Sequence, residues 1–488
     1  MSILFLPYYI KIIGIEAYGI VGFYITLLAL SQLLDLGLCM TVNREMARLL
    51  PHKNGVDECR HMTRTLEWIY WPMAVLIATV IAVLAPYLAN DWIKAQELTK
   101  ATVRQAIYCA GIALAFQWPG ALYAGGLTGL QKQVLLNVII IIFATLRALG
   151  MIVVLTFISP TIQAFFLWQT VSNTLQTITV AICFWKNLQG SLLPPQFDWK
   201  ILKRVKGFAL GIASTTVLVV IASQLDRAIL SKMLTLEMFG YYSLAGVIAS
   251  TLHYATGSIY NTFFPRFSQL VSMNDEKALK HAYHSGCQLM AVVAIPCALM
   301  VALFSNELMF FWTGNAETAE RTSTLISLLT TGTLLNGLLM LPYALQLAYG
   351  WTKLGLYQCL VVIVVQIPLL ILGVIYYGVT AAAWVSIMLN FFLFFITIPL
   401  MHRKIIRQEK MRWYLQDVAF PLFASLAMVL TGRWLFLKID GGQVVQISAI
   451  VIIFIFSFLS AVLAAPLARQ RAIQFLLKKQ ATMVNTDG

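Results

Sequence analysis

Two ionisable side chains inside long apolar segments are the residues of this sequence whose type and position could do chemistry. Arg147 stands in IIIIFATLRALGMIVVL, and Asp35 stands in the apolar run QLLDLGLCM. An ionised group in hydrocarbon costs about 2.5–3.5 kcal/mol on insertion scales, so it is retained where it meets a partner or faces a cavity. Each residue is therefore a candidate for function, and each also has a structural interpretation.

The two interpretations differ in what the charge meets. Arg147 lies near the middle of its segment, so it faces either a transported anion or an internal acid in an ion pair. On a helix, Asp35 would share a face with Gln32, Ser31 and Tyr24. This polar stripe predicts an inward-facing carboxylate that either fixes helix packing by hydrogen bonds or takes part in proton coupling or gating.

Three further residues are candidates near the middle of the chain. SQLDRAILSK contains Asp226 and Arg227, which are adjacent, point to different helix faces and need not pair. Arg227 lines the outer mouth of a cavity or simply lies at the interface, and Asp226 is a coupling or gating candidate. His253, in STLHYATGS, is either a satisfied core histidine or a proton-linked switch.

The sequence contains none of the motifs that indicate an enzyme. HExxH, GxSxG and a P-loop do not occur, and the seven cysteines form no CxxC pair. We therefore expect no catalytic residues, no metal site and no cofactor, apart from possible coupling to H⁺ or Na⁺.

Composition defines the elements that must position these residues. Hydrophobic residues make up 60% of the 488 residues and charged residues 11%, against about 25% charged in soluble domains. Apolar runs of about 20 residues recur, each long enough to cross a membrane as a helix. The sequence predicts an all-α, polytopic membrane protein with about 14 spans, the first of them short. The expected spans are 1–13, 18–42, 66–89, 104–128, 133–158, 162–185, 207–230, 238–263, 285–312, 322–348, 355–377, 380–401, 414–437 and 443–466.

The net charge of +14 follows from topology rather than from nucleic-acid binding. With the N-terminus inside, the inside connectors carry 24 Lys and Arg residues and the outside connectors carry 7. This asymmetry follows the positive-inside rule and predicts that both termini are cytoplasmic. DNA and RNA are not expected as partners.

Two short motifs repeat at a fixed spacing. GIEAYG (14–19) matches TLEMFG (235–240) at an offset of 221 residues, and GLQKQVL (129–135) matches GWTKLGL (350–356) at the same offset. The repeat predicts two six-helix lobes with the same orientation, related by an axis along the membrane normal. Because few residues precede Glu16, we expect that the native chain starts upstream of Met1 or that the first helix is truncated.

The repeat also predicts the division of the chain. The N-terminal six-helix lobe is 1–185, the C-terminal lobe is 207–401, and a two-helix segment, 413–466, follows. The basic stretch 186–206, with two adjacent prolines, is expected to be a cytoplasmic linker.

The motifs LPYYIKIIGIEAYG, LLDLGL and NREMAR, with QLDRAILSKMLTLEMFGYYSLA and FPRFSQL in the second half, resemble a known family. They are similar to those of the Wzx-type polysaccharide flippases, in the polysaccharide transporter family of the multidrug/oligosaccharidyl-lipid/polysaccharide exporter superfamily. The resemblance covers most of the chain and implies MATE-like lobes. It also implies translocation of undecaprenyl-diphosphate-linked oligosaccharides across the bacterial inner membrane, for O-antigen or other surface polysaccharide.

The resemblance further implies a cationic cavity, in which Arg147 and Arg227 would face the substrate. Arg44, Arg48 and Arg266 would receive the diphosphate at the cytoplasmic entrance, or would be plain positive-inside residues. The implied partners are the lipid-linked oligosaccharide, membrane lipids, the polysaccharide polymerase and the chain-length regulator. Three alternatives remain: an ion-coupled exporter of drugs or organic cations, a membrane enzyme such as a polymerase or ligase, and a non-transporting scaffold.

Overall fold

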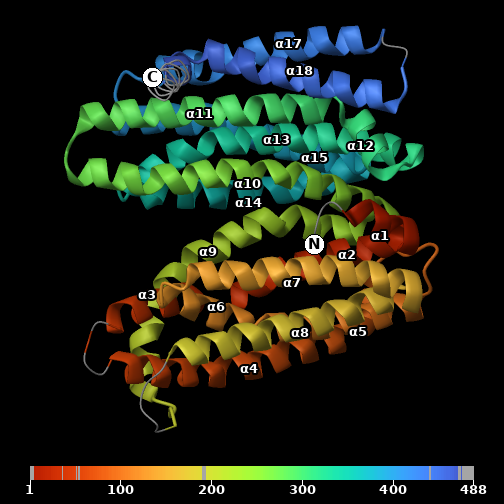
Figure 1. Ribbon diagram of the computed structural model, residues 1–488, viewed down its shortest axis with the longest axis vertical. Helices are drawn as coiled ribbons and strands as arrows, with labels where there is room; N and C mark the ends of the chain where they lie inside the picture. Colours follow the sequence, from red (N-terminus) through yellow and green to blue (C-terminus); the bar gives the residue numbers. More distant parts are fainter. Residues whose placement is uncertain are drawn as a thin grey trace, which may run out of the picture. The chain divides into compact units, whose positions relative to one another are not determined.

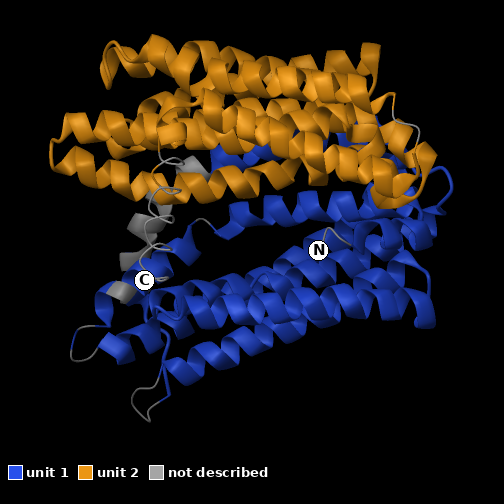
Figure 2. Cartoon of the chain, turned by 45° about the horizontal axis from the view of Figure 1, so that its top comes forward, with its two compact units in different colours: residues 1–241 blue, residues 242–488 orange. Residues whose placement is uncertain are grey.

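The described part of the chain folds almost entirely into long helices (Figure 1). The computed structural model describes residues 5–35, 37–50, 52, 55–188, 194–438, 441–470 and 474; at 47, 200, 202 and 204–216 only the backbone is described. The chain divides into two compact units, 1–241 and 242–488 (Figure 2). These units are defined by internal contacts, whereas the six-helix lobes inferred from the repeat stay a prediction.

Unit 1 is a bundle in which α5 packs against α4 and α8, and α8 packs in turn against α7 and α6. Its first three helices are short, and α3 packs against α6. The helices of unit 1 are α1 (Leu6–Ile13), α2 (Ile15–Ser31), α3 (Leu38–Leu49), α4 (Gly55–Tyr87), α5 (Lys100–Gln117), α6 (Gly120–Gly129), α7 (Gln133–Val153), α8 (Ile162–Asn187) and α9 (Trp199–Met233).

Unit 2 is built around α11 and α13, which pack against each other. The last two long helices, α17 and α18, lie side by side and both contact α11 (Figure 1). The helices that begin or lie in unit 2 are α10 (Leu236–Ser272), α11 (Glu276–Leu303), α12 (Ser305–Thr313), α13 (Ala316–Ala348), α14 (Thr352–Tyr377), α15 (Thr380–Lys404), α16 (Lys410–Arg412), α17 (Phe420–Phe436) and α18 (Gln443–Ala464).

Nine helical segments among the described residues are long and apolar enough to cross a membrane. They are Ile15–Asp35, Gly55–Trp92, Gln133–Ile158, Glu276–Leu303, Ala316–Ala348, Thr352–Tyr377, Thr380–Lys404, Lys410–Phe436 and Gln443–Ala464. The protein is therefore a multi-pass, all-helical membrane protein. The other expected spans also coincide with helices, but their number stays a prediction.

Two of the expected spans are interrupted helices rather than continuous ones. The segment 18–42 leaves the α-helix at Ser31, passes through a 3₁₀ turn at Gln32–Asp35 and resumes as α3 after Gly37, whose φ is +73°. Only glycine adopts this left-handed conformation without steric cost, so Gly37 permits the break. The segment 104–128 is divided in the same way at Pro119, where α5 ends and α6 begins.

The expected linker also becomes helical before its end. Helix α9 begins at Trp199 and continues without a break to Met233. The last residues of the 186–206 stretch are therefore the first turns of the helix that follows.

The repeated EAYG and EMFG motifs hold a close crossing between α2 and the first turn of α10. A Cβ atom added to Gly19 would overlap the backbone oxygen of Leu236, and one added to Gly240 would lie 2.5 Å from the backbone oxygen of Ile15. The contact is reciprocal, because Leu236 and Gly240 follow Ile15 and Gly19 by the same 221 residues.

Glu16 of the same motif is buried and organises the neighbouring loop. Its carboxylate accepts hydrogen bonds from the backbone N–H groups of Gln96, Glu97 (2.8 Å) and Leu98 (3.0 Å). A carboxylate that accepts three amide hydrogen bonds is well compensated even when buried. Glu16 therefore has a structural role in connecting α2 to the loop that precedes α5.

Candidate functional site

The Arg147 guanidinium lies among neutral hydrogen-bonding groups rather than beside an acid. It is half-buried on α7, and its Nη2 donates to Oε1 of Gln176 on α8 at 2.5 Å. Its Nε is buried and has no hydrogen-bond partner in the described part of the chain. No carboxylate of a described residue lies within ion-pair distance of this side chain. The expected ion pair with an internal acid is therefore not found among these residues.

A chain of polar side chains connects three helices beside Arg147. Tyr24 on α2 is close enough to interact electrostatically with Arg147, and its hydroxyl donates to Oε1 of Gln117 on α5 at 3.0 Å. Asn173 on α8 donates to the same oxygen at 3.0 Å and accepts from Nε2 of Gln169 at 3.3 Å. These groups are all neutral, so their hydrogen bonds hold α2, α5 and α8 together without neutralising the charge of Arg147.

This arrangement is suited to holding an anion. A guanidinium that is half-buried and retains its charge attracts phosphate or carboxylate strongly, because the local dielectric is lower than that of water. The backbone of Arg147 is also anchored to α8, because the indole N–H of Trp168 donates to the Arg147 carbonyl oxygen at 3.0 Å. The geometry therefore favours the anion interpretation of Arg147.

Asp35 lies at the break between α2 and α3, so the polar stripe expected on a continuous helix is wrong. Its carboxylate accepts a hydrogen bond from the hydroxyl of Tyr70 on α4, which is fully buried, and another from the backbone N–H of Cys39 at 3.2 Å. The second bond satisfies one of the free N–H groups in the first turn of α3. These contacts favour the interpretation in which Asp35 fixes helix packing: it joins α3 to α4 and stabilises the break between α2 and α3.

We expect Asp35→Asn to fold and function normally, because the amide oxygen can accept the Tyr70 hydrogen bond and only the longer contact with the Cys39 N–H is lost. Asp35→Leu should lower the free energy of unfolding by about 1–3 kcal/mol, since the Tyr70 hydroxyl loses its acceptor. Thermal unfolding in detergent and complementation of cells that lack the protein would measure stability and function. A folded but inactive Asp35→Asn protein would instead support the coupling role.

The arginines expected at the cytoplasmic entrance have different surroundings. Arg44 and Arg48 are both exposed, one turn apart on α3, and Nη2 of Arg48 lies 2.6 Å from Oε2 of the buried Glu45. Arg266 is exposed on α10 and donates to Oε1 of Gln269 at 2.7 Å. The convergence of these three arginines on one ligand stays a prediction.

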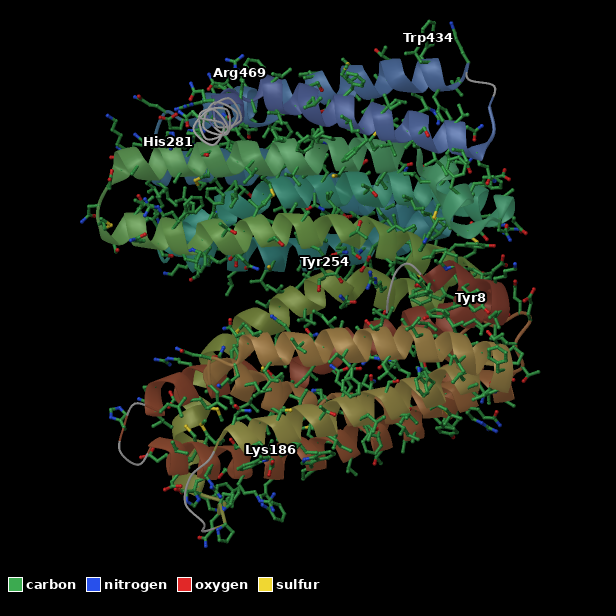
Figure 3. The ribbon with its side chains drawn as sticks, viewed as in Figure 1. Tyr8, Lys186, Tyr254, His281, Trp434 and Arg469 are labelled. Carbon is green, nitrogen blue, oxygen red and sulfur yellow. The ribbon has the colours of Figure 1, made fainter. Side chains whose placement is uncertain are left out.

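The remaining candidates lie on α9 and α10. Arg227 is half-buried and interacts electrostatically with Tyr18, a buried tyrosine whose hydroxyl has no hydrogen-bond partner among the described residues. Asp226 is also half-buried. His253 is exposed, next to the exposed Tyr254 (Figure 3), and its role stays a prediction.

A buried cluster in unit 2 was missed by the sequence analysis. Nδ1 of His284 on α11 lies 2.5 Å from Oδ2 of Asp417, and both residues are fully buried. Gln288 donates to Oδ1 of Asp417 at 2.9 Å and accepts from the backbone N–H of Leu467 at 2.7 Å. Because 133 residues separate His284 from Asp417, no local spacing could have indicated this pairing.

Comparisons with known proteins agree with this fold. The family model for "Polysaccharide biosynthesis protein" matches residues 11–317. A candidate O-antigen transporter of Shigella flexneri is 22% identical over 372 residues, which cover 76% of this chain and 86% of that protein.

Two solved structures have a similar fold. The lipid II flippase MurJ, in an inward closed conformation, superposes with a TM-score of 0.62 at 13% identity, over 90% of this chain and 92% of its own. An inward-facing multidrug resistance MATE family transporter of the MOP superfamily gives a TM-score of 0.63 at 14% identity, over 83% of this chain and 97% of its own. With the family model covering most of its length, the chain belongs to the polysaccharide biosynthesis protein family.

Proposed function

We propose that this protein is a flippase that moves undecaprenyl-diphosphate-linked oligosaccharide repeat units across the bacterial inner membrane for O-antigen or another surface polysaccharide. The observation that carries the proposal is the half-buried Arg147, which has no carboxylate partner among the described residues. A diphosphate is the part of such a substrate that a guanidinium recognises best. The family and the similarity to a candidate O-antigen transporter support the same substrate class.

The proposed mechanism is alternating access by the two lobes that the repeat predicts. The glycan and diphosphate would pass through a polar path, while the polyprenyl tail remains in the lipid. Both termini would be cytoplasmic, as the charge asymmetry predicts. Arg227 would contribute to the anion path, H⁺ or Na⁺ could supply the driving force, and the polysaccharide polymerase would receive the product.

Replacing Arg147 tests this proposal directly. We expect Arg147→Ala to reduce surface polysaccharide about tenfold or more in cells that depend on this protein, because a charge-assisted hydrogen bond contributes about 1.5–3 kcal/mol. Arg147→Lys should retain part of the activity, since it keeps the charge but loses the planar donor geometry. The measurement is the amount of polymer per cell, normalised to the amount of protein in the membrane.

The matched control is Arg321→Ala. Arg321 is exposed on α13, and its Nη2 lies 3.0 Å from Oε1 of Glu317, so the change removes one arginine charge from the surface. Polymer should be unchanged in this variant. Normal polymer in Arg147→Ala at normal expression would contradict the anion role. Export of organic cations that persists in Arg147→Ala would favour the exporter alternative.

A further inference from the structure

A basic pocket lies in unit 2 at the C-terminal end of α15. It has a volume of about 380 Å³, and its basic lining residues are Arg403, Arg407 and Lys410. Pro399 and Met411 add apolar surface, and the Met411 side chain is 57% exposed. The pocket therefore combines several positive charges with an apolar edge.

The three cations of the pocket have no acidic partner among the described residues. All three are exposed, and no ion pair joins any of them to a described carboxylate. The basic residues next to them differ: Nζ of Lys404 lies 4.1 Å from the ring centre of Trp351, and Nη1 of Arg412 lies 3.6 Å from Oε2 of Glu409. Convergent, uncompensated cations in one pocket create a strong local potential for an anion with several oxygens.

The acid nearest to the pocket is already engaged elsewhere. Oε2 of Glu409 lies 3.2 Å from Nε2 of His284, in addition to its contact with Arg412. Its charge also acts on His402, as does that of Lys410. The carboxylate therefore belongs to the buried cluster behind the pocket rather than to the set of exposed cations.

His402 indicates which anion fits. It lines the pocket but is only 2% exposed, and its Nδ1 lies 2.9 Å from the carbonyl oxygen of Ile398. A carbonyl oxygen can only accept, so Nδ1 carries the proton and Nε2 of the neutral ring is an acceptor. This Nε2 is buried and has no hydrogen-bond partner among the described residues. A phosphate monoester can retain one P–OH proton near neutral pH, so it can donate to Nε2, whereas a phosphodiester has no proton to donate.

The position of the pocket suits a headgroup at the membrane surface. The contact between Glu409 and His284 places it near the start of α11, at the end of unit 2 where His281 and Arg469 lie, opposite the end that carries Trp434 (Figure 3). The basic residues 403–412 assign this end to the cytoplasm by the positive-inside rule. Basic pockets between membrane helices on the cytoplasmic side bind anionic lipid headgroups.

We propose that this pocket binds a phosphate group that keeps a P–OH proton, either as the monoester headgroup of an anionic lipid in the cytoplasmic leaflet or as free phosphate. The site is separate from Arg147 and does not depend on the proposed transport function. The bound phosphate would be held by Arg403, Arg407 and Lys410, with His402 selecting a phosphate that has a P–OH proton to donate.

Binding to the purified full-length protein in detergent tests the proposal. The probes are inorganic phosphate alone, a short-chain phosphatidic acid, a phosphatidylglycerol and a phosphatidylcholine, with the thermal unfolding midpoint and native mass spectrometry as readouts. We expect phosphatidic acid to bind more tightly than phosphatidylglycerol, and phosphatidylcholine not to bind at this site. Arg407→Gln should weaken binding of phosphatidic acid about tenfold, the effect of losing one charge-assisted interaction.

Lys404→Gln is the matched control, because it removes one charge from the adjacent turn but none from the lining of the pocket. Its affinity for phosphatidic acid should equal that of the unchanged protein. Competition by inorganic phosphate would identify free phosphate as a ligand, whereas its failure to compete would restrict the site to the lipid. Equal affinities of Arg407→Gln and Lys404→Gln, or equal binding of phosphatidic acid and phosphatidylcholine, would overturn the proposal.

Discussion

Asp417→Ala should lower the free energy of unfolding by about 3–5 kcal/mol, the usual effect of breaking a buried, hydrogen-bonded charge pair. The carboxylate accepts from Gln288 and contacts Nδ1 of His284, and all three side chains are fully buried. Its loss leaves Nδ1 of the imidazole and Nε2 of the amide without their partner at a buried site, which costs the desolvation of both groups. Thermal or denaturant unfolding in detergent would measure the effect.

The same substitution should weaken the packing of the C-terminal helices α17 and α18 against α11 in particular. Gln288 connects α11 to the backbone of Leu467, after α18, while Asp417 lies just before α17. Hydrogen exchange should therefore increase first in α17 and α18. Glu276→Gln is the control, because this carboxylate lies on the same helix α11, is 66% exposed and pairs with Lys280 at the surface, so its loss should leave unfolding nearly unchanged. An Asp417→Ala protein that unfolds like the unchanged one would contradict the structural role of the cluster.

Gly19→Ala and Gly240→Ala should each lower the amount of folded protein in the membrane by a similar degree. Either Cβ atom would meet a backbone oxygen of the opposite helix, which cannot move aside as a side chain could. Overpacking typically costs about 1–3 kcal/mol, and a clash with backbone is at the upper end of that range. Because the two contacts are reciprocal, the double variant should be less destabilised than the sum of the single variants.

Gly257→Ala on α10 provides the control for this pair. A Cβ atom at Gly257 would have nothing within 4 Å, so alanine should be neutral or stabilise the helix by about 0.5–1 kcal/mol. The measurement is the fraction of protein that remains monodisperse after extraction in detergent. If Gly240→Ala gave the same monodisperse fraction as Gly257→Ala, then α2 and α10 would not cross as closely as described.

The sequence predicted the helical membrane fold because hydrocarbon imposes a simple rule on composition. A spanning segment must be apolar for about 20 residues and must satisfy its own backbone, so length and hydropathy predict a helix without any tertiary information. The repeat motifs were visible for a similar reason, since Glu16 and Gly19 recur with equivalent spacing at Glu237 and Gly240. What the motif does, the close crossing of α2 and α10, was not visible.

The surroundings of each ionisable residue were decided by the tertiary structure alone. The apolar pattern around Asp35 predicts a continuous helix, but the left-handed Gly37 breaks that helix, and the carboxylate accepts a hydrogen bond from Tyr70, 35 residues away. Arg147 could equally have met an acid or an anion until the fold placed Gln176 and Tyr24 beside it.

The sequence by itself therefore established that the chain folds in a membrane and which of its segments are helical, because both properties follow from local composition. It also identified Arg147 as an unusual charge. Only the tertiary structure decided which charges are paired, as with His284 and Asp417, and which have no carboxylate partner among the described residues, as with Arg147, Arg403 and Arg407. The physical reason is that the free energy of a buried charge depends on partners a few ångströms away, and these partners come from distant positions in the chain.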